Sequence, residues 1–371
     1  MKVNYRQLSI LVFMSFIALK FLALPCLLYK ESGNMSWLVA LVLMLIDMVY
    51  AILIIELMSK NQNKNVYEFM CETLGVVLTK IFLFVLMLKY IFTIVNITKS
   101  LENFVISNFY SEFSWVLFAL PLISVVGFMC YKGIQNIGRV FEMFFWAIVI
   151  GCVYIALKSI MKVDLFNFLP FFKQGAKPIF DAAFTYANWF GSATFLIMLF
   201  GNVDFKEKKT KKLIVYLLSA IVLVMLIYFV FYGIFGITSP THNFAISDIS
   251  QFVRGSSIID ELSWLIIALW IVAQTIQIAM YGFAFVVAFT HIFNVKVKIV
   301  PIIILDLIMF SWGIINREVI YLEEIFFHPA TSIMSIIAQY IIPIFLWIGY
   351  AVRNSKTKKE GKCENRLETN I

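Results

Sequence analysis

The chain has 371 residues, of which 62% are hydrophobic and only 14% charged, and its mean hydropathy is +0.90. A water-soluble domain of this length does not have such a composition, whereas a polytopic membrane protein does. The formal net charge of +8 invites a nucleic-acid partner. The basic residues instead concentrate in alternate loops and in the C-terminal tail, so we expect a lipid bilayer and no nucleic acid as the partner.

The apolar residues fall into about ten stretches, each near the length of about 20 residues that crosses a bilayer core as a helix. We therefore predict an all-α integral membrane protein with one polytopic domain over residues 1–353. A basic cytoplasmic tail, residues 354–371, is expected to be disordered. The connection 159–181 is apolar enough to lie in the membrane interface, or it simply joins two helices. The predicted spans are 8–28, 36–59, 76–99, 114–131, 140–158, 182–202, 213–237, 260–291, 299–316 and 331–352.

The distribution of lysine and arginine predicts the topology. If the N-terminus is cytoplasmic, the segments that share its side of the membrane carry most of the 30 basic residues. This is the positive-inside pattern, and it places both termini in the cytoplasm. The first apolar run has no cleavage site behind it, so we expect it to remain as a helix.

Motifs for catalysis, metals and cofactors are absent from the sequence. The five cysteines are scattered and three histidines lie in loops or at span ends, so we expect no metal site, no disulfide and no cofactor. Nucleophile-elbow, zinc-protease, Walker and Rossmann motifs are also missing, and we predict that the protein is not an enzyme.

The first span contains an ionisable residue near its middle and a proline five positions later. Proline removes a backbone hydrogen bond, so we expect the helix to bend or unwind just before Pro25. Freed backbone groups inside a membrane need protein or water partners, and such breaks line cavities. We interpret the stretch around Lys20 as half of a ligand site.

Ten spans divide into two sets of five, residues 8–158 and 182–352, and an odd number gives the two sets opposite orientations. Many transporters use such an inverted repeat around a site at the membrane midplane. The sixth span should then be broken like the first. Asn188, Gly191 and Ser192 are poor helix formers in its first half, although small residues also serve as packing positions in unbroken helices.

Several short motifs, in this order and spacing, resemble the B subunit of bacterial spore germinant receptors of the GerAB type, in the amino acid–polyamine–organocation transporter superfamily. The resemblance covers nearly the whole hydrophobic chain. The motifs are Arg6-Gln7-Leu8 with Leu24-Pro25, Gly138-Arg139-Val140-Phe141-Glu142, Asp164 to Pro170, Phe190-Gly191 with Phe195 to Phe200, Phe235-Gly236-Ile237, and Asp260-Glu261-Leu262 with Leu269-Trp270-Ile271.

The resemblance implies a LeuT-like fold with broken helices one and six beside helices three and eight. It implies a germinant, usually an amino acid, bound within the membrane domain, and a complex with an A-type subunit and a C-type lipoprotein subunit in the spore inner membrane. Two departures stand out. Lys20 adds a cation to helix one, and Ser192 replaces the carboxylate that many relatives have in helix six.

The expected ligand-binding residues come from four spans. Lys20 either meets a ligand carboxylate or stands in for a coupling cation, or it forms a structural ion pair with Asp47 or reaches toward an interface. On the third and eighth spans, the side chains at the expected pocket positions otherwise pack or bond between helices. The set is Ala18, Lys20, Phe21, Tyr90, Ile94, Asn188, Gly191, Ser192, Gln277 and Tyr281.

The sequence thus favours a receptor subunit that binds a small germinant between helices one, three, six and eight and triggers spore germination. The alternative on the same scaffold is a secondary amino acid transporter that works without partner subunits.

Overall fold

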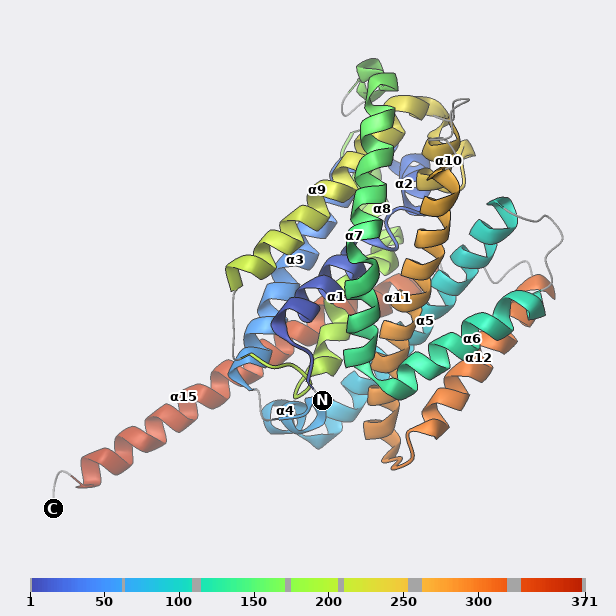
Figure 1. Cartoon of the computed structure of the whole chain (residues 1–371). Helices are drawn as coiled ribbons and strands as arrows, with labels where there is room; N and C mark the ends of the chain where they lie inside the picture. The colour runs from blue at the N-terminus through green and yellow to red at the C-terminus, as the bar shows by residue number, and fades with distance from the viewer. Residues whose placement is uncertain are drawn as a thin grey trace.

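The structure is a computed structural model that describes residues 2–61, 64–108, 115–170, 175–205, 210–252, 262–318 and 328–368. Its described part is helical except for turns and one isolated parallel β-bridge between Val3 and Val203 (Figure 1). Each of the ten predicted spans contains helix. Among the described residues, seven helical segments are long and apolar enough to cross a membrane, and two further apolar helices, Tyr5–Ile17 and Ile299–Ile315, are shorter.

The first predicted span is two helices, α1 (Tyr5–Ile17) and α2 (Leu24–Ser32), separated by turns at residues 18–23. Asn4 and Gln7 begin α1 with a reciprocal capping box. Pro25 lies in the first turn of α2, where a missing backbone N–H leaves no helical bond unmade. The predicted break is therefore present, and it falls on the residues around Lys20.

The sixth predicted span is also broken. Helix α8 (Lys177–Thr185) gives way to a short 3₁₀ turn, η4 (Ala187–Trp189), and then to extended backbone at Phe190. Gly191 adopts a left-handed conformation with φ +76°, and a second 3₁₀ segment, η5 (Ser192–Leu199), follows it. A buried 3₁₀ run of this length is uncommon and is typical of hinges or strained sites.

Unbroken helices surround the two breaks. Figure 1 shows α1 inside the bundle, where it packs against α7 and α9, and α11 packs against α5, α6, α7 and α12. The bounds are α3 (Ser36–Lys60), α5 (Val76–Asn108), α6 (Trp115–Lys132), α7 (Ile134–Ser159), α9 (Thr210–Phe235), α11 (Leu262–Phe293) and α12 (Ile299–Glu318).

The last predicted span has three parts: α14 (Pro329–Ile336), a π-helical segment η8 (Ile337–Ile341) and α15 (Ile342–Glu368). Figure 1 shows α15 leaving the bundle as a long straight helix. Residues 354–368, which the sequence predicts to be disordered, continue this helix. The segment is rich in lysine and glutamate, which are good helix formers, and this propensity explains the difference.

Short helices fill the connections. They are α4 (Val66–Leu74), α10 (Ala245–Phe252) and the 3₁₀ turns η1 (Gly33–Met35), η2 (Ile160–Lys162), η3 (Leu165–Phe168) and η6 (Gly236–Thr241).

Three of the sequence motifs make contacts away from the breaks. Arg6 forms an ion pair of 3.1 Å with Glu142, and Gln7 donates a hydrogen bond of 3.3 Å to the same carboxylate. Elsewhere, the backbone N–H of Asp164 and the side-chain amide of Asn167 both donate to the carbonyl of Gly233, at 2.9 and 2.8 Å. These motifs therefore hold helices and connections together rather than lining the breaks.

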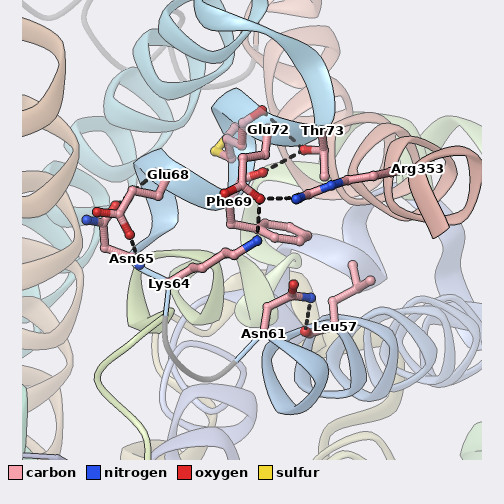
Figure 2. Close-up of polar contacts among 10 residues, drawn as sticks. Leu57, Asn61, Lys64, Asn65, Glu68, Phe69, Glu72, Thr73 and Arg353 are labelled. Carbon is pink, nitrogen blue, oxygen red and sulfur yellow. Dashed lines mark hydrogen bonds and ion pairs between the residues drawn. The ribbon is translucent and has the colours of Figure 1, made fainter. Parts of the chain in front are cut away.

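A small charged cluster joins α4 to α15. Glu72 accepts hydrogen bonds from Lys64 and from Arg353, and Figure 2 shows both cations converging on this carboxylate. All three side chains are about one third exposed or more. The hydrogen bond from Lys64, and then that from Arg353, lower the pKa of Glu72 from its usual 4.5. Asn65 and Glu68 form the capping box that begins α4.

Candidate functional site

The break in the first span has free backbone carbonyls, and neighbouring helices satisfy them. The carbonyl of Ala18 accepts a hydrogen bond of 2.5 Å from the side-chain amide of Gln274 in α11. Those of Phe21 and Leu22 accept from the backbone N–H groups of Ile246 and Ala245, at 3.3 and 3.2 Å, at the start of α10. The break is therefore stable in a low-dielectric setting because protein groups replace the missing helical bonds.

The break in the sixth span uses side chains in the same way. Lys89 of α5 donates 2.8 Å to the carbonyl of Asn188, and Gln339 of the π segment donates 3.0 Å to that of Ala187. On its other side, the N–H groups of Gly191 and Ser192 donate to the carboxylate of Asp47, at 2.8 and 3.2 Å. In this break, two backbone carbonyls therefore accept hydrogen bonds from Lys89 and Gln339, and two backbone N–H groups donate to Asp47.

The two breaks meet at Lys20 and Ser192. The ammonium of Lys20 donates a hydrogen bond of 2.5 Å to the hydroxyl of Ser192. Its nitrogen also lies 5.3 Å from the ring centre of Phe190 and 5.9 Å from that of Phe16, which is cation–π range. The two residues at which the sequence departs from the resembled pattern, Lys20 and Ser192, are thus in direct contact.

Lys20 and Asp47 are not directly hydrogen-bonded. Both contact residue 192, Lys20 through the hydroxyl and Asp47 through the backbone N–H. The two side chains interact electrostatically across residue 192. They make no direct ion pair, because the Asp47 oxygens accept from the backbone of the sixth span. Tyr340 lies 3.4 Å from the same carboxylate.

The third span contributes Lys89 and Tyr90. Lys89, whose partner the sequence does not reveal, ends on the carbonyl of Asn188. Tyr90 donates 2.9 Å to the carbonyl of Thr194 in η5, and its ring lies 6.2 Å from that of Tyr281. Ile94 is fully buried one turn further along α5. Phe21 stacks on Trp270 of α11, with ring centres 5.2 Å apart.

The eighth span places two glutamines toward this centre. Gln274 bonds to Ala18 as described, and Gln277 follows one turn later with an exposed fraction of 0%. Within the described part of the chain, neither amide atom of Gln277 has a partner at full hydrogen-bond geometry, and the hydroxyl of Tyr281, one turn further along α11, is the polar group beside it. Tyr281 packs its ring 6.3 Å from that of Phe195. Leaving a buried amide without a hydrogen bond costs about 1–3 kcal/mol, which a bound polar group would recover.

Three residues of the last span escaped the sequence interpretation. Gln339 and Tyr340 lie in the π segment, and Ser335 one turn earlier bonds to the side chain of Asn188. Polar residues within an apolar span indicate a buried contact, so the sequence could have marked these three. It does not show that their contacts are with the sixth span. Glycine is required at 191 because a Cβ there would lie 2.1 Å from Cγ of Gln339.

Burial makes this centre unusual. Lys20, Asp47 and Lys89 are 0%, 1% and 2% exposed, so two basic side chains and one acidic side chain are buried at this centre. Intramembrane ionisable side chains are rare and mark ligand or ion sites by default. Within the described residues, no group of three or more His, Cys, Asp or Glu side chains is arranged to hold a metal ion.

Comparison with known proteins agrees with the motif pattern. The model of a family described as spore germination protein matches residues 2–320. Spore germination protein KB of Bacillus subtilis (strain 168) is 20% identical over 302 residues, which cover 80% of each chain. Putative spore germination protein YfkT of the same organism is 20% identical over 329 residues, 87% of this chain and 89% of that protein. Because the family model covers most of the sequence, the chain belongs to the spore germination protein family of membrane proteins.

Proposed function

We propose that the chain is the membrane subunit of a spore germinant receptor and that it binds a small germinant where the two breaks meet. The observation that carries this proposal is the buried contact between Lys20 and Ser192, which joins the two broken spans. Broken helices supply backbone groups for ligands near the membrane midplane, and buried ionisable residues beside them mark the site. The ten predicted pocket residues are proposed as its lining.

Ligand binding would act by exchanging contacts. Lys20 and Ser192 are both buried against one another, so a ligand reaches them only when the two segments separate. A germinant that replaces the serine hydroxyl at Lys20 stabilises the separated arrangement. The free energy available to the signal equals the difference in the ligand's affinity for the two arrangements.

The proposed architecture is the LeuT-like inverted repeat, with both termini in the cytoplasm. Side-chain contacts between loops support the topology, because they join segments predicted to lie on the same side. Lys64 and Arg353 share Glu72 on the predicted inner side, and Asn34 bonds to the carbonyl of Leu169 on the outer side. We further propose that A-type and C-type lipoprotein subunits complete the receptor in the spore inner membrane.

A secondary amino acid transporter is the alternative, and the two broken spans favour it equally. The distinction is functional. A transporter moves labelled amino acid across a vesicle membrane when it is reconstituted alone. A receptor subunit binds its ligand without net flux and loses its effect when partner subunits are deleted.

The test uses spores in which this receptor is the only one. Lys20→Met keeps the length and apolar body of the side chain and removes its charge. We expect normal protein levels on a blot and a requirement for at least about tenfold more germinant across a panel of small metabolites, since a charged hydrogen bond contributes about 1.5–3 kcal/mol. Lys132→Met, at an exposed lysine at the end of α6, is the matched control and should leave germination unchanged.

Three results would count against the proposal. Unchanged germination with normal levels of the Lys20→Met protein would place the site elsewhere. Loss of the protein from the membrane would make Lys20 a structural residue. Spores that lack the chain but germinate normally would remove the receptor function altogether.

A further inference from the structure

We propose, on the basis of the proposed function, that the ligand of this site is a small carboxylic acid without an ammonium group and that Lys20 binds its carboxylate. This narrows the ligand from amino acids in general to net anionic compounds. Three features carry the inference: the unfilled donors of Lys20, the charge balance of the buried cluster and the occupation of the carbonyls at the breaks.

Lys20 has more hydrogen-bond donors than acceptors. A lysine ammonium carries three N–H groups, and in the described part of the chain Lys20 makes one hydrogen bond, to the neutral hydroxyl of Ser192. The side chain is fully buried, so bulk water does not reach the remaining donors. Aromatic rings of Phe16 and Phe190 flank the nitrogen without accepting a conventional hydrogen bond. The position lacks an anionic acceptor.

The charges of the cluster do not balance. The cluster of Lys20, Lys89 and Asp47 contains two basic side chains and one acidic side chain. It therefore has one basic group that no acid of the cluster matches. A buried charge is tolerated when it is paired and hydrogen-bonded. A ligand carboxylate supplies the acid that matches the second basic side chain, whereas a zwitterionic amino acid adds an ammonium together with its carboxylate.

The backbone acceptors that would hold a ligand ammonium already have donors. The carbonyls of Ala18, Ala187 and Asn188 accept from Gln274, Gln339 and Lys89, respectively. Those of Phe21 and Leu22 accept from the start of α10. Lys89 in particular places an ammonium of the protein on the sixth-span carbonyl. A second ammonium from the ligand would compete with these donors and meet two lysines nearby.

The buried amide of Gln277, which has only the hydroxyl of Tyr281 beside it, then suits the uncharged remainder of the ligand. It is fully buried and can both donate and accept. Since it follows Gln274 on the same face of α11, it lies toward the first-span break rather than the membrane. A hydroxyl or amide on the ligand would satisfy it, but the inference depends only on the carboxylate.

The test measures binding to the purified full-length chain in detergent by thermal shift and calorimetry. The probes are four matched sets, each with an amino acid, its amide and the acid that lacks the amino group. The amino acids are alanine, leucine, phenylalanine and asparagine, and the corresponding acids are propanoate, 4-methylpentanoate, 3-phenylpropanoate and succinamate. We expect at least one acid to bind at least about tenfold more tightly than its parent amino acid, and no amide to bind.

Variants make the result specific to the site. Lys20→Met should abolish binding of the acid, and Lys132→Met should retain it. Lys20→Arg, which keeps the charge, should retain part of the affinity if the protein folds, and a melting curve without ligand checks folding. Loss of binding in Lys20→Met despite a normal melting curve supports the proposal.

Other outcomes overturn it. Preference for the amino acid over its acid shows that the ammonium is required, and binding of an amide shows that the carboxylate is not; both refute the inference while the receptor function stands. If none of the acids binds although spores respond to another compound through this chain, the inference also fails alone. If spores respond to nothing through this chain, the proposed function fails with it.

Discussion

Two clusters in this protein contain the same charges in opposite surroundings. Lys64, Arg353 and Glu72 lie at the surface between α4 and α15, and both cations bond directly to the carboxylate (Figure 2). Lys20, Lys89 and Asp47 are almost completely buried, and in the described part of the chain each bonds to a neutral group instead of pairing directly. Each cluster consists of two basic side chains and one acidic side chain.

The difference shows where the excess charge goes. At the surface, water and salt solvate it, and such pairs contribute about 0–1 kcal/mol to stability. In the interior, backbone and hydroxyl groups must solvate each ion in place of water. Because removing ions from water is costly, apolar side chains of the same size often make a fold as stable or more stable. An interior cluster of this kind is a poor way to stabilise a fold, so its presence at the junction of two broken spans argues for a ligand.

Removing the carboxylate charge should give the largest difference in stability loss between the two clusters. Asp47→Asn leaves two buried lysines without any anion and weakens the acceptor for the N–H groups of Gly191 and Ser192. We expect a loss of about 3–5 kcal/mol, as for other broken buried charge sets. Apparent melting in detergent and the amount of protein in the membrane measure it. Glu72→Gln makes the same chemical change at the surface and should lower stability by no more than about 1 kcal/mol.

A double variant tests whether Lys20 and Asp47 act together across residue 192. In the Asp47→Asn background, Lys20→Met removes one of the stranded cations, so the double variant should be more stable than Asp47→Asn alone. Independent sites would add within about 0.5 kcal/mol. Additive melting shifts would therefore mean that the two residues do not share a cluster, and the comparison with the surface would lose its basis.

The next largest effect is expected at Gly191, whose left-handed backbone conformation positions its N–H group against Asp47. Gly191→Ala forces an alanine to φ +76° and places its Cβ 2.1 Å from Gln339 Cγ. Left-handed strain costs about 1–2 kcal/mol and overpacking about 1–3 kcal/mol, so we expect a loss of about 2–5 kcal/mol in apparent stability. Gly175 has the same φ with no atom within 4 Å of an added Cβ. Gly175→Ala is therefore the control for strain alone, and equal losses at the two sites would contradict the contact with Gln339.

The sequence predicts some parts of this centre and not others, for physical reasons. Pro25 and Gly191 restrict backbone conformation locally, and so the two breaks can be predicted from them. Lys20 is recognisable because a cation in the middle of an apolar span has few explanations. The partner of Lys89 is a backbone carbonyl, which has no sequence signature. Gln339 and Tyr340 contact the sixth span from a π-helical segment. Side-chain directions there differ from those that the α-helical period of 3.6 residues predicts.

The smallest expected effect is the pH dependence of the surface cluster. The pKa of Glu72 lies below its usual 4.5 because of its hydrogen bonds to Lys64 and Arg353. A carboxyl whose pKa is lowered by folding adds stability above its unfolded pKa, and that stability is lost as the pH falls through the folded value. The melting temperatures of wild type and Glu72→Gln should therefore differ slightly at pH 7 and converge as the pH falls through the folded pKa of Glu72, which lies below 4.5.

High salt, like acid, should reduce the difference in melting temperature between wild type and Glu72→Gln. At about 1 M salt the screening length is about 3 Å, which weakens exposed pairs but leaves buried ones largely unaffected. We expect the difference between wild type and Glu72→Gln to shrink in 1 M sodium chloride, while that between wild type and Asp47→Asn persists. A salt-sensitive loss in Asp47→Asn would mean that water reaches the interior cluster in this arrangement. Lys20 would then need no ligand to satisfy its remaining donors, and the case for an anionic germinant would rest on binding measurements alone.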